Sequence, residues 1–462
     1  MTTTAAAAPT ASAVLASFGT SFELADVEPR VVEKVKVHLL DTLGAAIAGA
    51  ASREAAAART AYLATGGERT GARLWGTPLR ERPATAALLN GIAAHALELD
   101  DSDGCDHSGA VVVPAVLAAA SLRPASGADI VRATLLGYEV ARRVMDASGG
   151  YAACNAAGWH STGTCGSFGA AAAAAAVLRL DKREHAWALG LAGSFTGGVW
   201  AFIDDGAMSK RLHAGRAAEN GLTSAALARA GFTGPLNIFE AEWGGYFSTY
   251  VPATASPPEL VAALGETWRV SQASIKPHAS CRDTHSAVDV VLDHPELDPA
   301  SVDAIVVRTS ALAARMCGGT DVTTMVDAQM SMPHCIAAAL LHGRVGLTEI
   351  GADVRADPRV RDLVRRTHVE ADHRADGEPP SLTFHLVDGS ARTFQGTAPL
   401  GSTGRPMSTE QIVRKFSDLA GRALPSDRVA ALVETTLTLE RRPDASELLE
   451  LLVADPLPPA LL

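Results

Sequence analysis

Seven consecutive alanines, Ala170 to Ala176, constrain the fold of this chain more than any other feature of its sequence. They lie in a segment, GAAAAAAAVL, that is small or apolar on nearly every face. A helix without a polar face is buried on several sides, and its small side chains let neighbouring helices approach closely. The segment therefore predicts a helix inside a closely packed helical bundle.

Further segments between about residues 25 and 265 place apolar residues at helical spacing. Examples are VVEKVKVHLLDTLGAAIAGA, ADIVRATLLGYEVARRVMDA and GRAAENGLTSAALARAG. Glycines, prolines and short polar turns separate these segments, as expected for the connections between helices. We interpret residues 1–271 as the first part of a large all-helical domain.

The pattern changes after residue 271. The segments VDAIVVRTS and SLTFHLVDGSARTFQGT alternate apolar with polar residues, and the Asp-Gly turn in the second predicts a hairpin. A helical segment, MSMPHCIAAALLHGR, lies between them. Residues 272–397 are therefore predicted to form a smaller α+β domain. Residues 398–462 read as helices again, with Ser408 as an N-cap, and are expected to pack back on the helical domain. The predicted fold class is mainly α.

Composition and charge exclude several kinds of partner. Lys and Arg total 40 of the 462 residues against 51 Asp and Glu, and a net charge of −11 argues against a nucleic acid ligand. The first residues lack the features of a signal peptide, and no apolar run is long enough to cross a bilayer, so we expect a cytoplasmic protein without a membrane partner. The six cysteines form no CxxC pair, and no metal site is expected.

An acidic stretch, HALELDDSDGCDHSGAVVVPA, begins at residue 95. We expect a helix that carries Glu98, Asp100 and Asp101 at its C-terminal end, where carboxylates oppose the helix dipole and need a local reason. One interpretation is a solvated acidic loop. The other is that His107, with a carboxylate neighbour that raises its basicity, serves as an acid or base.

Two further polar stretches lie in the predicted helical domain. In GWHSTGTCGSFG, His160 precedes a helix, where it either caps that helix or helps to bind an anion. In SKRLHAGRAAENG, Lys210 and His213 share one helical stripe, whereas Arg211 and Arg216 are expected to point elsewhere. These cations are either ordinary surface residues or the wall of a carboxylate pocket, because unpaired cations beside apolar residues are costly.

The fourth polar stretch, IKPHASCRDTHSAVD, opens the predicted α+β domain. Its cations, Lys276 and Arg282, are suited to hold carboxylates across a cleft, although a solvated turn explains them equally well. Cys281 is either a nucleophile or a small buried side chain.

The order of these segments, together with GYEVARRV, DAQMSMPHCIAAALL and GRPMSTEQIVRKFSDLA, resembles the MmgE/PrpD family over nearly the whole chain. The resemblance implies an all-helical domain with an inserted α+β lid domain, a homodimer, and catalysis without a metal or organic cofactor on small di- or tricarboxylates. It implies that the catalytic residues are His107, His160 and Lys210. It implies that the substrate-binding residues are Glu98, Asp101, Ser102, Lys276, His278, Cys281, Arg282 and His285.

The reactions of this family require a proton to be moved at a carbon next to a carboxylate, or a carbanion to be stabilised after CO2 leaves. Cations stabilise the negative charge and a histidine transfers the proton. The first hypothesis is therefore a cofactor-independent lyase that dehydrates or decarboxylates a small carboxylate. The second is an epimerase or isomerase of a small dicarboxylate. The third is a binding protein without activity. The catalytic pocket is expected between the helical domain and the lid.

Overall fold

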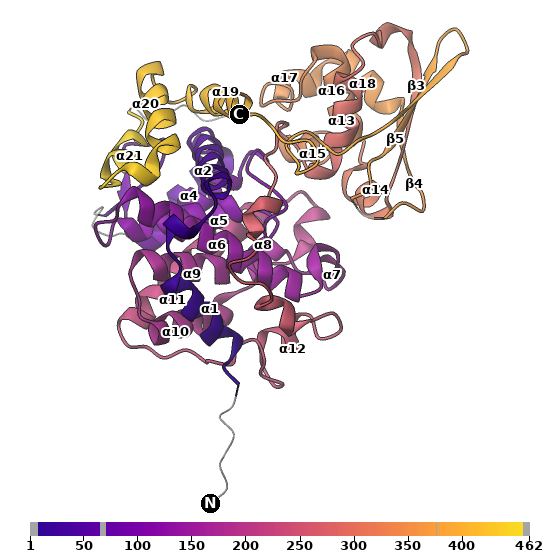
Figure 1. Cartoon of the computed structure of the whole chain (residues 1–462). Helices are drawn as coiled ribbons and strands as arrows, with labels where there is room; N and C mark the ends of the chain where they lie inside the picture. Colours follow the sequence, from indigo (N-terminus) through magenta and orange to yellow (C-terminus); the bar gives the residue numbers. More distant parts are fainter. Residues whose placement is uncertain (1–7, 65–70, 376, 456–462) are drawn as a thin grey trace, which may run out of the picture.

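The computed structural model describes residues 8–64, 71–375 and 377–455. As predicted, the fold is mainly α with one small sheet (Figure 1). We call the first group of elements, together with the last three helices, the helical body. This first group contains α1 Ala11–Ser21, α2 Pro29–Gly49, α3 Arg53–Ala64, β1 Ala72–Arg73, β2 Arg80–Glu81, α4 Pro83–His95, α5 Ser108–Ala120, α6 Gly127–Ala147, α7 Gly150–Ala156, α8 Ser161–Thr164, α9 Gly166–Val177, α10 Lys182–Phe195, α11 Ser209–Arg229 and α12 Tyr246–Tyr250.

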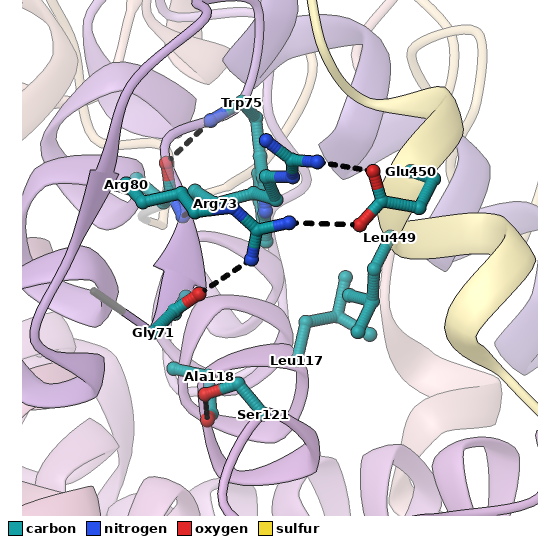
Figure 2. Close-up of a pocket in the computed structure, with 11 residues that line it drawn as sticks. Gly71, Arg73, Trp75, Arg80, Leu117, Ala118, Ser121, Leu449 and Glu450 are labelled. Carbon is teal, nitrogen blue, oxygen red and sulfur yellow. Dashed lines mark hydrogen bonds and ion pairs between the residues drawn. The ribbon is translucent and has the colours of Figure 1, made fainter. Parts of the chain in front are cut away.

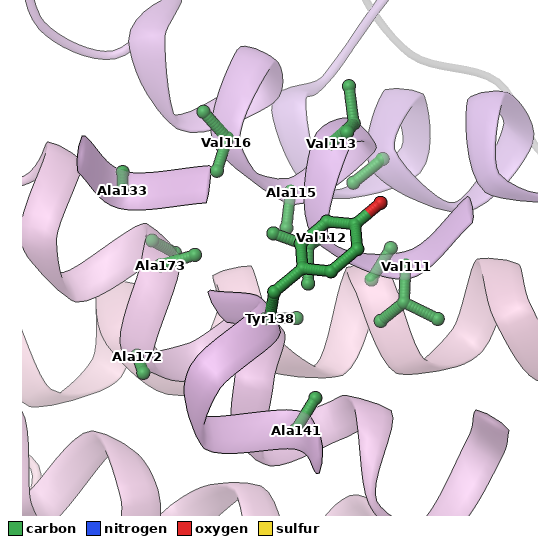
Figure 3. Packing of buried hydrophobic residues seen from close by; sticks show 14 of the residues in the cluster. Val111, Val112, Val113, Ala115, Val116, Ala133, Tyr138, Ala141, Ala172 and Ala173 are labelled. Carbon is green, nitrogen blue, oxygen red and sulfur yellow. The ribbon is translucent and has the colours of Figure 1, made fainter. Parts of the chain in front are cut away.

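The alanine run forms helix α9, which contacts α5, α6, α10 and α11 in the core of the helical body. Figure 3 shows Ala172 and Ala173 of this helix packed near Val112 and Tyr138. The helices approach closely because small residues face each other: a Cβ added to Gly221 would lie 2.3 Å from the Cβ of Ala170. The prediction of a buried, closely packed helix is confirmed.

The second group of elements contains the sheet and lies beside the helical body (Figure 1). We call residues 276–395 the α+β part. Its elements are α13 His285–Leu292, β3 Val302–Thr309, α14 Ala311–Cys317, α15 Met325–Gln329, α16 Met332–His342, α17 Ala352–Ala356, α18 Pro358–Arg365, β4 Thr367–Ala371, β5 Ser381–Leu386 and β6 Ala391–Gln395.

The strand order in this sheet is β4-β3-β5-β6, with β3 and β4 parallel and the other pairs antiparallel. The predicted strand is confirmed as β3, and the predicted hairpin is confirmed as β5 and β6. Gly389 in the hairpin turn has a φ of 83°, a conformation that favours glycine. Ile305 and Phe384 pair across β3 and β5 and are buried in a core shared with α13 and α16. Strand β4 was not predicted.

Three helices return the chain to the helical body: α19 Thr409–Ala420, α20 Ser426–Leu437 and α21 Ser446–Leu451. The hydroxyl of Ser408 accepts a hydrogen bond from the backbone N–H of Gln411, which confirms Ser408 as the N-cap of α19. Helix α19 packs on α2, where Gly44 leaves room for Phe416. Within the described residues, no helix combines the length and the apolarity that crossing a membrane requires.

Candidate active site

A cavity of about 310 Å³ has walls from both the helical body and the α+β part. Its wall on the helical body comes chiefly from the segment 98–107, which we call the acidic loop, and from α6, α7 and α11. Its other wall comes from residues 281–283 and 310–316. The polar and charged residues that line it are Glu98, Ser102, Asp103, Asp106, His107, Arg142, Tyr151, Trp200, Lys210, Cys281, Arg282, Asp283 and Ser310.

The acidic loop is not the end of a helix, and the expectation that a helix carries Glu98, Asp100 and Asp101 is wrong. Helix α4 ends at His95. Glu98, Asp103 and Asp106 have φ values of 54°, 60° and 89°, a left-handed conformation that a helix does not contain and that costs about 1–3 kcal/mol per non-glycine residue. Such conformations persist where buried contacts hold them, and they occur often at functional sites.

Asp101 anchors the acidic loop in the core. Its carboxylate accepts hydrogen bonds from the hydroxyl of Tyr138 at 2.5 Å and the backbone N–H of Gly109 at 2.9 Å, and His38 Nδ1 lies 3.1 Å away. Figure 3 shows the Tyr138 ring surrounded by apolar side chains. Asp101 was predicted to bind substrate, but it is fully buried and does not line the cavity. In the structure it supports the acidic loop.

His107 lines the cavity at the start of α5. Its Nδ1 lies 2.8 Å from the carbonyl oxygen of Asp101 and 3.1 Å from the carboxylate of Asp100, and its Nε2 lies 3.4 Å from the carboxylate of Asp106. Burial lowers the pKa of His107, but the charges of Asp106 and Asp100 outweigh burial and place this pKa above its ordinary value. These surroundings therefore favour the protonated form of His107 next to the cavity.

His160 lies behind Asp106 and does not line the cavity. Its Nε2 lies 3.3 Å from the carboxylate of Asp106, and its Nδ1 lies 3.0 Å from Nδ1 of His213. Burial lowers the pKa of His160, and it lowers that of His213 to about 3. Their neutral forms are therefore favoured, whereas the surroundings of His107 favour its charged form.

Glu98 is the centre of a buried cluster of charges. Its carboxylate pairs with Lys210 and Arg211 of α11, and Nζ of Lys276 lies 3.0 Å away. Burial raises the pKa of Glu98, but the charges of these cations hold that pKa well below its usual range. The anion that pairs with Lys210 is thus part of the protein, although Lys210 also lines the cavity.

The helical stripe predicted that Arg211 points away from Lys210 and His213, and this prediction is wrong. It is buried, pairs with Glu98 and donates a hydrogen bond to the side-chain oxygen of Gln329 in the α+β part at 2.9 Å. Arg216 does point away, where it is exposed and pairs with Glu219. The tight turn after α4 carries Glu98 to the α11 face on which both Lys210 and Arg211 lie, and a helical wheel of α11 alone cannot show this.

Three residues of the fourth polar stretch, Cys281, Arg282 and Asp283, line the cavity. The Nη1 group of Arg282 donates to the carbonyl oxygen of Leu400 at 3.1 Å, and its Nε lies 3.8 Å from Asp103. Its Nη2 group is buried and has no hydrogen-bond partner among the described residues. Arg282 therefore retains a donor for a ligand. Ser102 also lines the cavity, and its backbone pairs with that of Ser274.

The other predicted residues of this stretch do not reach the cavity. Lys276 is fully buried against Glu98. His278 lies 2.9 Å from the carboxylate of Asp289 and lines a separate groove beside α19. His285 is buried behind Arg282.

Two family models cover most of the chain: the MmgE/PrpD N-terminal domain matches residues 13–256, and the MmgE/PrpD C-terminal domain matches residues 278–440. The chain belongs to the MmgE/PrpD family.

Curated relatives in this family align with nearly the full length of the chain. A cis-aconitate decarboxylase of Aspergillus terreus is 29% identical over 458 residues, which cover 92% of each chain. The cis-aconitate decarboxylase of Homo sapiens is 27% identical over 454 residues, which cover 93% of this chain and 92% of the relative. The cis-aconitate decarboxylase-like protein oryM of Aspergillus oryzae is 28% identical over 475 residues, with 96% and 97% coverage. This MmgE/PrpD member is a lyase-type enzyme, as the sequence predicted.

Sequence reasoning missed His95 in this MmgE/PrpD protein. His95 is the last residue of α4, and its Nδ1 lies 2.9 Å from the carboxylate of Asp100. Burial lowers its pKa to about 3. The signal that could have indicated His95 is its position shortly before Asp100 in the same acidic stretch.

A second cavity, of about 150 Å³, lies between β1, β2 and α21 (Figure 2). Arg73 and Arg80 lie in this cavity, and both pair with Glu450. One carboxylate of the protein therefore offsets part of their charge. Among the lining residues, no histidine or cysteine accompanies them. The cavity next to His107 is the better candidate for the active site of this MmgE/PrpD protein.

Proposed function

We propose that this protein decarboxylates a small tricarboxylate of the cis-aconitate type without a cofactor. The observation that carries the proposal is the position of His107, between the carboxylates of Asp100 and Asp106, at a cavity also lined by the cations Lys210, Arg142 and Arg282. The curated relatives named cis-aconitate decarboxylase support the choice of reaction and substrate.

The cations bind the substrate carboxylates. Arg282 offers its free Nη2 donor from the α+β part, and Lys210 and Arg142 approach from the helical body. A volume of about 310 Å³ suits a small molecule, because ligand pockets begin at about 300 Å³. Three separate cations in one cavity favour a substrate with several carboxylates over a monocarboxylate.

The reaction breaks the bond between a carbon of the substrate and one of its carboxylates. CO2 leaves, and the electron pair stays on the remaining carbon framework, where a neighbouring double bond and carboxylate spread the charge. Cations around that carboxylate stabilise the charge as it develops. The imidazolium of His107 gives its proton to the carbon that carries the charge, and a proton from solvent restores His107. The net change consumes one proton and yields a dicarboxylate and CO2.

One observation favours epimerisation as a second candidate. Epimerisation needs two proton-transfer groups at one carbon, and Cys281 of the α+β part lines the same cavity as His107 of the helical body. A thiolate of Cys281 would take a proton from one face of the carbon and become a thiol, and the imidazolium of His107 would give a proton to the other face and become neutral; exchange with solvent restores both groups.

Product analysis in deuterated water separates the candidate reactions. With cis-aconitate as the substrate, we expect release of one CO2 per turnover and one solvent deuterium bound to carbon in the product. If the protein instead removes water from a hydroxylated tricarboxylate and releases no CO2, the reaction is dehydration and the proposal of decarboxylation is wrong. If a dicarboxylate is recovered with unchanged connectivity and with deuterium at a stereocentre, the reaction is epimerisation.

We further propose that the protein is a cytoplasmic homodimer. The support for a dimer is the exposure of large apolar side chains in the segment 232–243, where Trp243 is 93% and Phe232 is 60% exposed. Exposed aromatic side chains of this size are typical of interfaces. Sedimentation of the wild type is expected to give the mass of a dimer, and Trp243→Glu is expected to weaken it. A wild type that sediments as a monomer at micromolar concentration would contradict this proposal.

A further inference from the structure

Three buried imidazoles, those of His95, His107 and His160, meet at the edge of the cavity. A ring nitrogen of each lies within 4.8 Å of one from each of the others. The ring centroids of His95 and His107 are 4.2 Å apart, and that of His160 lies 6.2 Å and 6.3 Å from them. Histidines at such distances are close enough to bind one ion together after small side-chain movements.

The Nδ1 atom of each imidazole already has a partner that orients the ring. The partners are the carboxylate of Asp100 for His95, the carbonyl oxygen of Asp101 for His107 and the ring of His213 for His160. The Nε2 atom of His95 is buried and forms no hydrogen bond with any described residue, and the buried Nε2 atom of His160 faces the carboxylate of Asp106 at 3.3 Å. Metal-binding histidines show the same division, with one nitrogen held by the protein and the other left for the ion.

Asp106 supplies an oxygen ligand at the same place. One carboxylate oxygen lies 3.4 Å from Nε2 of His107, and the other lies 3.3 Å from Nε2 of His160. Three imidazoles and one carboxylate match the preference of Zn²⁺ for four nitrogen and oxygen ligands. Ca²⁺ and Mg²⁺ prefer sites built from oxygen, so they fit this set poorly.

We propose that His95, His107, His160 and Asp106 bind a first-row transition-metal cation such as Zn²⁺, and that the bound ion inhibits the enzyme. Asp106 and His107 line the cavity, which gives the ion a path to the two buried histidines. An imidazole of His107 that binds the ion through Nε2 has no proton on that nitrogen to give to the substrate. The inhibition rests on the role of His107 in the proposed function, whereas the binding of the ion does not.

Spectroscopic titration with Co²⁺ tests the binding. Four-coordinate Co²⁺ absorbs visible light far more strongly than the hydrated ion, so the wild type is expected to give an intense visible band that Zn²⁺ abolishes. His95→Gln is expected to weaken Co²⁺ binding at least tenfold. His185→Gln is the matched control, because His185 is equally buried in the helical body and lies outside the cluster. Equal binding by His95→Gln and wild type, or an equal loss in His185→Gln, would overturn the site.

Diffraction from wild-type crystals soaked in Zn²⁺ tests the site without any variant. Anomalous scattering is expected to place the ion within bonding distance of His95, His107 and His160. An ion found only at other histidines overturns the site even if His95→Gln fails to fold.

Activity then tests the inhibition separately. Micromolar Zn²⁺ is expected to abolish turnover, and a chelator is expected to restore it fully. If the ion occupies the site and turnover continues, the metal site stands, but the inhibition and the role of His107 as proton donor are both wrong. If the protein shows no turnover of cis-aconitate under any condition, the proposed function fails and the Co²⁺ and diffraction results still decide the site.

Discussion

Nζ of Lys276 lies 3.0 Å from a carboxylate oxygen of Glu98, and both side chains are buried. Lys276 belongs to the α+β part, and Glu98 belongs to the acidic loop of the helical body. Because Lys210 and Arg211 of α11 pair with the same carboxylate, one anion joins the two walls of the cavity. Glu98 therefore fixes the position of Lys210 at the cavity wall.

Glu98→Gln is expected to destabilise the protein by about 3–5 kcal/mol, because it leaves buried cations without their counter-charge. Chemical denaturation measures the free energy of unfolding. Glu219→Gln is the control, since it removes a pair with the exposed Arg216 and is expected to cost about 0–1 kcal/mol. Equal losses in the two variants would show that the Glu98 cluster adds nothing beyond a surface pair.

His107→Gln is expected to lower kcat by about 10²–10⁴, the usual contribution of a positioned acid or base. KM is expected to change little, because glutamine retains a polar group at the cavity wall. Steady-state kinetics measures both constants. The control is the same substitution at His294, a residue outside the cavity lining that pairs with Glu296. It is expected to leave kcat unchanged. Near wild-type turnover in His107→Gln would move the proton-transfer role to another residue.

Asp106→Asn is expected to move the basic limb of the pH profile of kcat/KM to lower pH. The active form of His107 is protonated, so activity falls as the pH rises through the pKa of His107. The charge of Asp106 raises that pKa, and asparagine removes the charge. A limb that stays in place, or that moves to higher pH, would contradict the assignment of this limb to His107.

Arg282→Gln is expected to raise KM by about 10–100-fold, because it removes a hydrogen bond to a charged group worth about 1.5–3 kcal/mol. Arg282→Lys keeps the charge without the planar fork and is expected to give an intermediate KM. Arg405→Gln, a change at a partly exposed pair with Asp293, is the control. If Arg282→Gln retains the wild-type KM, the free Nη2 donor of Arg282 does not bind substrate.

Tyr138→Phe is expected to cost about 1–3 kcal/mol of stability, because the buried carboxylate of Asp101 loses a hydrogen bond. It is also expected to lower kcat, although Tyr138 does not line the cavity, since Asp101 holds the loop that positions His107. Tyr250→Phe removes a hydrogen bond to the carbonyl of Thr196 and is expected to leave kcat unchanged. A loss of stability in Tyr138→Phe with unchanged kcat would limit Asp101 to a structural role.

Elements whose periodicity is local could be predicted from the sequence alone. The alanine run predicted the buried helix α9, and the alternation around an Asp-Gly turn predicted β5 and β6. Strand β4 was missed because its five residues, THVEA, carry little pattern of their own. It becomes a strand by pairing in parallel with β3, whose matching residues lie about 60 positions earlier in the chain.

The sequence also determined which motifs carry the site, but only the tertiary structure decided which charges face each other. The cations of α11 indicated a missing anion, and Glu98, 112 positions away from Lys210, supplies it. His107 and His160 looked equivalent as candidate acids, yet the surroundings raise the pKa of His107 and lower that of His160. Both lie next to Asp106, but only His107 also contacts Asp100. The pKa of a buried group depends on the charges packed around it, and sequence spacing does not reveal those neighbours.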